Sequence, residues 1–413
     1  MSLADDMLAM GARARTAAGQ LRTAPADRRS AAIRAAAALL RDRAADILAA
    51  NAEDVAAATF LVDRLRLDEG RVEAIAASLD QVAALPDPVG AEMARWRRPS
   101  GLDIARVRTP IGVIGMIFES RPNVAADAAA ICLRSGNALI LRGGSDALRS
   151  CLAIHEAIAA GLEQAGLPVD AVQIVPTADR AAVGAMLAGL GGAIDLIIPR
   201  GGKALVARVE EEARVPVLGH LEGICHTYVH ASADPGMALD IVVNAKMRRV
   251  SVCGATETLL IDRAAAPDLL PRIAAALAEQ GCVLRGDAES RGLAEGIEPA
   301  EEADWTAEYL APILAVRIVA GLDEAVGHIR RYGSGHTDAI VAEDQAAAEA
   351  FLAEVDSAIA MWNASTQFAD GGEFGFGAEI GIATGRLHAR GPVGPEQLTT
   401  FKYVVRGTGQ VRG

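Results

Sequence analysis

The stretch that decides the fold is residues 111–145, IGVIGMIFESRPNVAADAAAICLRSGNALILRGGS. It holds a short apolar run at 112–118, an alanine-rich segment at 124–135 and a second apolar run at 138–141, followed by a glycine pair. Short apolar runs separated by helix-length segments are typical of parallel strands that helices cover on both faces. We therefore predict a strand, a helix and a second strand here, with ligands bound at the carboxyl ends of the strands.

The same alternation continues toward the C-terminus. Further strands are predicted at 172–175, 195–198 and 215–218, and helices at 146–165, 179–190 and 203–213. A second α/β section then runs from about Thr227 to Ile380, with strands predicted at 258–261, 313–319, 339–341 and 358–362. The sequence therefore predicts an α/β protein built in more than one section.

Residues before this region predict helices, over about the first 85 positions. In 33–48 the apolar residues recur on one face of a helix, with Pro25 near the predicted start and Asn51 near the predicted end. Between the helices and the first sheet, segments 94–98 and 102–108 predict a hairpin. It is short and charged, so we expect it to pair with something else, such as another subunit.

Composition excludes several classes of function. Lys plus Arg number 40 and Asp plus Glu number 53, a net charge of −13, which disfavours general nucleic-acid binding. No apolar run is long enough to span a membrane, and no CxxC pair indicates a metal site, and we expect no signal peptide. We expect a cytoplasmic protein with reduced thiols, no membrane or nucleic-acid partner and no metal.

Two glycine pairs each follow an arginine between a predicted strand and a predicted helix: Gly143-Gly144 after Arg142, and Gly201-Gly202 after Arg200. Glycine lets a ligand approach the backbone, and a helix N-terminus favours phosphate. The alternative is that each pair only makes a tight turn. The ordinary GxGxxG dinucleotide fingerprint is absent, so a dinucleotide would need another binding mode.

Cys253 stands among small residues just before a predicted strand, where its thiolate is able to attack a carbonyl carbon beside its own backbone N–H. The alternative is a small buried hydrophobic residue. That alternative is favoured for Cys132 and Cys151, which fall in apolar helices. Cys225 precedes His226, but neighbours on a strand point to opposite faces, which weakens a Cys–His couple.

Asn123 precedes a predicted helix, so its favoured interpretation is an N-cap. The alternative is an amide that donates to a developing oxyanion. Glu222 and Glu308 are, from the residues alone, compatible with ordinary surface carboxylates.

Several long motifs in order resemble those of the gamma-glutamyl phosphate reductases, a family of the aldehyde dehydrogenase superfamily. The resemblance runs from about residue 105 to the C-terminus. The motifs that carry it are Gly112–Asn123, Ser135–Gly144, Ile198–Gly202, Gly223–His226, Asn244–Lys246, Cys253 with Glu257–Leu260, Asp370–Gly372, Gly377–Gly381 and His388–Pro392. Gly254 departs from the superfamily's pattern, in which asparagine is common after the nucleophile.

The resemblance implies an aldehyde dehydrogenase-like α/β fold, with a parallel-sheet cofactor domain, an α/β catalytic domain and a small oligomerisation hairpin. We expect the domains to divide as follows: 1–94 and 110–226 for the NADP-binding domain, with 381–392 returning to it; 95–109 and 393–413 for the oligomerisation element; and 227–380 for the catalytic domain. A homodimer or homotetramer is implied.

The resemblance also implies roles for particular residues. Cys253 matches the nucleophile, and Asn123 the oxyanion donor that acts with the Cys253 N–H. Glu222 falls where related enzymes keep a general base. Positions expected to bind NADP(H) are Arg142, Gly143 and Ser145 at the adenosine ribose, Gly201 and Gly202 at the pyrophosphate, and Glu308 at the nicotinamide ribose. An arginine at the ribose suits a 2′-phosphate. Arg121, Lys246 or Arg249 is expected to meet an anionic group of the substrate.

The implied reaction is the NADPH-dependent reduction of L-glutamyl 5-phosphate to L-glutamate 5-semialdehyde, through a cysteine thioester, in proline biosynthesis. The kinase that makes the acyl phosphate, glutamate 5-kinase, is a partner to consider. Two alternatives stay open. A CoA-acylating aldehyde dehydrogenase shares the thioester chemistry, and an NADP-binding scaffold would bind the cofactor without catalysis.

Overall fold

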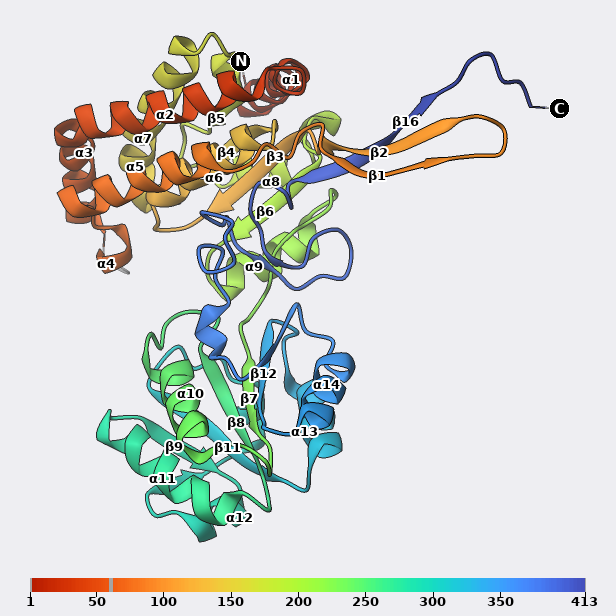
Figure 1. The fold of residues 1–413 in the computed structure, drawn as a ribbon. Helices are drawn as coiled ribbons and strands as arrows, with labels where there is room; N and C mark the ends of the chain where they lie inside the picture. The colour runs from red at the N-terminus through yellow and green to blue at the C-terminus, as the bar shows by residue number, and fades with distance from the viewer. Residues whose placement is uncertain (1, 59–61, 413) are drawn as a thin grey trace. The chain divides into compact units, whose positions relative to one another are not determined.

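The computed structural model describes residues 2–58 and 62–412, and these fall into two compact units (Figure 1). Unit 1 comprises Met1–Gly219, Gly375–Gly381 and Val393–Gly413. Unit 2 comprises His220–Phe374 and Ile382–Pro392. In the described residues no helix is long and apolar enough to cross a membrane.

The N-terminal part of unit 1 is helical, as predicted. Its helices are α1 Leu3–Leu21, α2 Ala26–Asp42, α3 Ala44–Ala57, α4 Val62–Leu65 and α5 Glu69–Ala84. The prediction also covered residues 59–61, which lie outside the described residues.

The prediction of one helix ending near Asn51 is wrong. The helix that starts after Pro25 ends at Asp42, and Asn51 lies buried inside α3. There its side chain donates to the Leu65 carbonyl (2.9 Å) and accepts from the Leu67 N–H (2.7 Å). Ile33 and Ile47 are buried on either side of the break, so the periodicity revealed the buried face but not the interruption.

The sheet of unit 1 is parallel, with strand order β5-β4-β3-β6. Its strands are β3 Val113–Phe118, β4 Ala138–Arg142, β5 Val172–Ile174 and β6 Leu196–Arg200. The helices between and after them are α6 Asn123–Arg134, α7 Leu148–Gln164, α8 Ala181–Leu187 and α9 Lys203–Glu212. The strand predicted at 215–218 is only a bridge from Val217 to Ile197, where Pro216 has no N–H to extend the ladder.

The predicted hairpin is confirmed, and it pairs with the C-terminal strand of its own chain (Figure 1). The three strands, which we call the flap, are β1 Glu92–Arg97, β2 Asp103–Pro110 and β16 Thr399–Arg406. β2 lies antiparallel between the other two, with Thr399 opposite Pro110 and Arg406 opposite Asp103. Trp96 and Tyr403 form an edge-to-face pair and are 38% and 56% exposed, so the flap presents apolar side chains to its surroundings.

Unit 2 is built on a seven-stranded parallel sheet of order β10-β9-β11-β8-β7-β12-β13. The strands are β7 Cys225–Val229, β8 Thr256–Asp262, β9 Val283–Gly286, β10 Ile297–Pro299, β11 Ile313–Val319, β12 Thr337–Val341 and β13 Ile359–Trp362. The helices are α10 Pro235–Met247, α11 Ala266–Glu279, α12 Ala288–Leu293, α13 Leu322–Tyr332 and α14 Gln345–Glu354. A short ladder joins β14 Ile382–Ala383 to β15 Gly391–Pro392.

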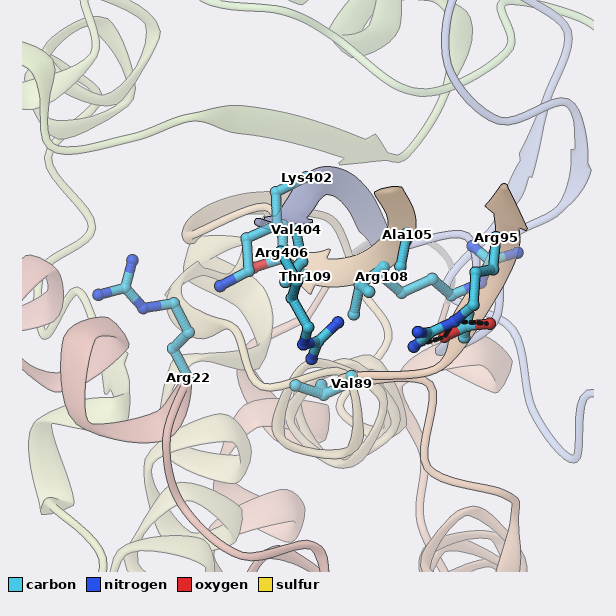
Figure 2. Close-up of a pocket in the computed structure, with 12 residues that line it drawn as sticks. Arg22, Val89, Arg95, Ala105, Arg108, Thr109, Lys402, Val404 and Arg406 are labelled. Carbon is cyan, nitrogen blue, oxygen red and sulfur yellow. Dashed lines mark hydrogen bonds and ion pairs between the residues drawn. The ribbon is translucent and has the colours of Figure 1, made fainter. Parts of the chain in front are cut away.

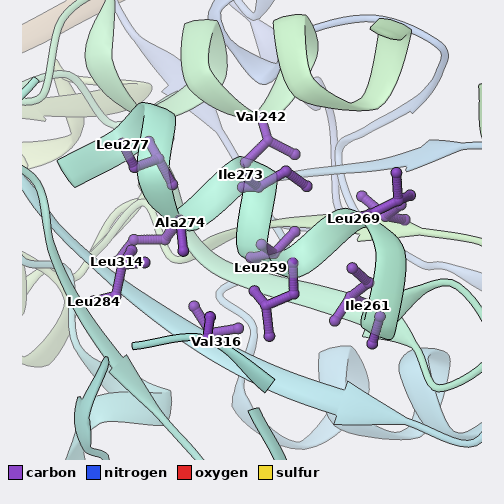
Figure 3. Packing of buried hydrophobic residues seen from close by; sticks show 14 of the residues in the cluster. Val242, Leu259, Ile261, Leu269, Ile273, Ala274, Leu277, Leu284, Leu314 and Val316 are labelled. Atoms are coloured by element: carbon purple, nitrogen blue, oxygen red, sulfur yellow. The ribbon is translucent and has the colours of Figure 1, made fainter. Parts of the chain in front are cut away.

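Leucine and isoleucine side chains of β8 and α11 interlock in the larger core of unit 2 (Figure 3). Leu259 and Ile261 project from β8 toward Leu269 and Ile273 of α11, and all four are buried. This packing holds β8, and with it the loop that carries Cys253, against a rigid layer.

The division into units differs from the predicted domain borders. The border falls at 219/220 rather than at 226/227, and residues 382–392 lie in unit 2 rather than returning to the cofactor domain. Hydrogen bonds explain both differences. His220 Nδ1 binds the Ile382 carbonyl at 2.6 Å, and Arg390 pairs with Asp356 at 2.8 Å.

Candidate active site

Of the five cysteines, all of which the structure describes, Cys253 is the one that is not buried. It lies in the turn between α10 and β8. Burial raises the pKa of the other four thiols, which keeps them protonated and unreactive. The expectation that Cys132 and Cys151 are core residues is confirmed.

The backbone of Gly223 packs directly against Cys253. A Cβ atom at position 223 would stand 2.2 Å from the Cys253 carbonyl oxygen and 2.6 Å from its Cα, so no other residue fits without a shift of the backbone. The Gly223 N–H donates to Glu308 Oε1 at 3.0 Å. The structure therefore brings Cys253, Glu308 and the loop that carries Glu222 together around one glycine.

Lack of room for a side chain also explains the glycine at position 254. A Cβ atom there would stand 3.0 Å from the Thr366 carbonyl oxygen, closer than ordinary contact. A larger residue at position 254 would push against the η5 turn, Thr366–Phe368.

Two histidines that the sequence analysis missed stand beside Cys253. One nitrogen of His220, one nitrogen of His336 and Cys253 Sγ all lie within 4.8 Å of one another. Cys225 is next to them, because its Sγ–H donates to the Cys253 carbonyl (3.1 Å) and its sulfur lies 3.6 Å from His336 Nδ1. His226 points to the other face and binds Asp338 at 2.8 Å, as the alternation of a strand requires.

Lys246 is fully buried and its ammonium contacts Glu257 Oε2 at 2.5 Å. Burial raises the pKa of Glu257 to about 7, against the opposing effect of Lys246. The Leu310 N–H donates to the other oxygen of Glu257 at 3.3 Å, which ties this pair to the segment that carries Glu308. In contrast Arg249, the other cation of this unit expected to meet substrate, is exposed.

In unit 1, Asn123 is the first residue of α6, not its cap. The N-cap position is held by Pro122, and the Asn123 side chain makes no capping bond. Its Nδ2 donates to Asp127 Oδ2 at 3.0 Å, and Asp127 also accepts from Ser78. The favoured N-cap interpretation is therefore wrong. An N-cap residue precedes its helix, whereas Asn123 is already the first residue of α6. Arg121, just before α6, is half-buried.

Arg142 is the last residue of β4, and its guanidinium donates to the carbonyls of Gly143 (2.6 Å) and Ala178 (3.1 Å). Its buried Nε has no hydrogen-bond partner among the described residues. A Cβ atom on Gly143 would press on Phe118 and Cys151, and one on Gly144 would meet Asp146. Ser145 opens the short helix η1, Ser145–Ala147.

At the second glycine pair, Gly201-Gly202, a backbone N–H already binds a carboxylate of the same chain. The Gly202 N–H, at the start of α9, donates to Glu119 Oε2 at 2.9 Å. A Cβ atom on Gly201 would stand 2.6 Å from the same oxygen. These donors bind a carboxylate as they would bind a phosphate oxygen. With the unpartnered Nε of Arg142, they fit a phosphate-bearing dinucleotide, provided that Glu119 moves aside.

A separate hollow of about 370 Å³ opens between the flap and the end of α1 (Figure 2). Five cationic side chains line it, namely Arg22, Arg95, Arg108, Lys402 and Arg406. Arg95 pairs with Glu92 at 2.8 Å. None of the site residues expected from the sequence lines this hollow, so it is separate from the surroundings of Cys253.

Known proteins share the sequence and the fold of this chain. The model of the aldehyde dehydrogenase family matches residues 2–287. The chain is 66% identical to the gamma-glutamyl phosphate reductase of Caulobacter sp. (strain K31), over all of both chains. The crystal structure of gamma-glutamyl phosphate reductase from Thermotoga maritima superposes with a TM-score of 0.96 at 43% identity, covering 98% of this chain and 100% of that one.

An acetylating aldehyde dehydrogenase from Geobacillus thermoglucosidasius has a TM-score of 0.72 at 18% identity, covering 99% of this chain and 98% of that chain. That likeness extends to the fold alone. The chain belongs to the aldehyde dehydrogenase family and, within it, to the gamma-glutamyl phosphate reductases. It is therefore an oxidoreductase, of a family that uses a nicotinamide cofactor.

Proposed function

We propose that this chain reduces L-glutamyl 5-phosphate to L-glutamate 5-semialdehyde, releasing phosphate, as a step of proline biosynthesis. The observation that carries the proposal is the single half-buried cysteine, Cys253, held against Gly223 and beside Glu308. The relatives named above support the choice of substrate. We also propose that the reaction takes place in the cytoplasm.

The Cys253 thiolate attacks the carbonyl carbon of the acyl phosphate, phosphate leaves, and a thioester forms on the sulfur. NADPH, when bound, supplies the hydride that reduces this thioester. The resulting oxyanion is held by the Cys253 N–H and by the Asn123 amide, and its collapse to the aldehyde releases the thiol. No water is activated in this direction, so Glu222 is a base that the reductive reaction does not need.

Arg142, Gly143 and Ser145 would hold the adenosine ribose with its 2′-phosphate, and Gly201 and Gly202 the pyrophosphate. Glu308 would hold the nicotinamide ribose. The buried Arg142 Nε without a partner and the carboxylate at the start of α9 are the observations that support this assignment.

Arg121 and Arg249 are the side chains that we propose for the anionic groups of the substrate. Lys246 was a third candidate. Because its ammonium is buried against Glu257, we assign it the role of holding that carboxylate in β8.

We further propose that the chain forms a homodimer or homotetramer through the flap. Its exposed Trp96 and Tyr403 support that role. Glutamate 5-kinase, which would make the unstable acyl phosphate, is the partner we propose to supply the substrate.

The reaction in reverse tests the function. Purified protein is mixed with glutamate semialdehyde, phosphate and NADP, and NADPH absorbance is followed. We expect NADPH formation that depends on phosphate, disappears in Cys253→Ala and persists in Cys282→Ala, a buried cysteine outside the site. Formation that depends on CoA instead of phosphate would replace this proposal with the CoA-acylating reaction.

A further inference from the structure

His220, Cys253 and His336 form a cluster in unit 2 that the proposed reaction does not explain. Their ligand atoms lie within 4.8 Å of one another, although the three residues are far apart in the sequence. The two imidazole rings meet edge to face, with centroids 5.0 Å apart. His336 is buried, whereas His220 and Cys253 are half-buried, so the cluster opens on the side of the thiol.

The hydrogen bonds of His220 orient it as a ligand. Its Nδ1 lies 2.6 Å from the Ile382 carbonyl oxygen, which only accepts, so Nδ1 carries the proton. The lone pair of the ring therefore stands on Nε2. A histidine that donates one ring N–H to a backbone carbonyl and offers the other nitrogen is the usual arrangement around a bound metal.

His336 is held from two sides. Its Nδ1 lies 2.9 Å from Thr337 Oγ1 and 3.6 Å from Cys225 Sγ. Cys225 itself stays outside the cluster as a ligand, because its S–H is directed at the Cys253 carbonyl (3.1 Å). The cluster therefore offers two imidazoles and one thiol.

We propose that His220, Cys253 and His336 bind one zinc ion and that the bound zinc blocks the Cys253 nucleophile. Two nitrogens and one sulfur, with a fourth position open, form a donor set that suits zinc. The same set does not suit magnesium or calcium, which prefer oxygen ligands. On binding, the thiol loses its proton to solvent and the sulfur bonds the metal. The blocking effect rests on the proposed function, whereas the binding does not.

The present spacing is compatible with this. Zinc bonds of about 2.1 Å to nitrogen and 2.3 Å to sulfur place tetrahedral ligand atoms about 3.5 Å apart. Because no two of the ligand atoms are more than 4.8 Å apart, binding requires a separation to close by at most about 1.3 Å. Rotation about the Cα–Cβ bond of Cys253 moves its Sγ without moving the backbone that Gly223 holds.

Cobalt titration of the chelator-treated full chain tests the site without any need for activity, because cobalt(II) in a zinc site is coloured. We expect one equivalent to bind, with a thiolate-to-cobalt band in the near ultraviolet that added zinc removes and added magnesium does not. Cys253→Ser should lose that band. His220→Gln and His336→Gln should each weaken binding by at least about tenfold.

Matched controls are His230→Gln, just after the end of β7, and Cys282→Ala, in the apolar core, which should bind cobalt like the unaltered chain. Circular dichroism and melting temperature show whether each variant folds. Zinc should also slow alkylation of Cys253 by iodoacetamide, followed by mass spectrometry. No cobalt binding, or a band that survives in Cys253→Ser, overturns the proposal.

The two proposals fail separately. A chain that binds cobalt through Cys253 but forms no NADPH refutes the proposed reaction and leaves the metal site standing. A chain that forms NADPH, and does so equally at high zinc concentration, refutes the metal block and leaves the reaction standing.

Discussion

Replacing Gly223 by alanine should disable Cys253, the proposed nucleophile, without removing any polar group. The added Cβ would stand 2.2 Å from the Cys253 carbonyl oxygen, 2.6 Å from its Cα and 2.7 Å from its Cβ. To reach the 3.4 Å at which ordinary contact begins, the two backbones must separate by about 1.2 Å. The Gly223 N–H that binds Glu308 is kept in alanine, so the change is purely steric.

A misplacement of about 1 Å in an active site costs about 10²-fold in rate, or about 2.7 kcal/mol of activation free energy. We therefore expect Gly223→Ala to lower kcat for phosphate-dependent NADPH formation by about 10²-fold. The rate of Cys253 alkylation should change as well, because the position of the thiol itself is disturbed. Both are measured on the purified variant, with the melting temperature recorded alongside.

The matched control is Gly327→Ala, in α13 of the same unit. No atom lies within 4 Å of the Cβ position there, so alanine should leave kcat unchanged and stabilise the helix by about 0.5–1 kcal/mol. If Gly223→Ala kept the kcat and the alkylation rate of the unaltered chain, the steric reasoning would be refuted.

Three further predictions follow from the same geometry. Asn123→Ala should reduce kcat by about 10²–10³-fold, the usual cost of one oxyanion donor, and an unchanged kcat would remove Asn123 from the mechanism. Arg142→Met should raise KM for NADP by about 10–100-fold, because one charged hydrogen bond contributes about that much to binding. KM for NAD should stay nearly unchanged. An equal rise for both cofactors would contradict a contact between Arg142 and the 2′-phosphate. Because burial raises the pKa of Glu257 from 4.5 to about 7, the folded chain binds this proton more tightly than the unfolded chain. Its contribution to the free energy of unfolding therefore falls as pH rises from 4.5 to about 7, and Glu257→Gln should flatten that part of a urea-unfolding series.

The strands that were predictable from the sequence are those with uninterrupted apolar runs. β11, Ile313–Val319, has the predicted bounds, and β3 and β4 differ from prediction by one residue each. β7 was missed because three of its five residues, Cys225, His226 and Thr227, are not typical of an apolar strand. His226 is buried because Asp338 binds it from β12, more than a hundred residues later in the chain. Thr227 and Cys225 find their partners at Thr256 of β8 and at the Cys253 carbonyl.

The same reason limits prediction of the site. Cys253 and Asn123 were identified because each stands in a motif that can be read along the chain. His220 and His336 stand in no such motif, and only the pairing of β7 with β12 brings His336 beside Cys225 and the nucleophile loop. For Asn123 the partner is local instead. It donates to Asp127, four residues later in the same helix, and such an i,i+4 spacing can be read from the sequence.

The reactivity of Cys253 and its proposed affinity for zinc have one physical origin. A thiol that attacks an acyl phosphate must be reachable and able to lose its proton, and both properties also make it a metal ligand. Gly223 and Gly254 place no side chain against the loop that carries Cys253. His220 and His336 add the nitrogen ligands that a single thiol lacks. Substitution of the histidines should therefore separate the two properties. His220→Gln removes a metal donor yet leaves the sulfur and its glycine neighbours in place, so alkylation of Cys253 should continue while protection by zinc is lost.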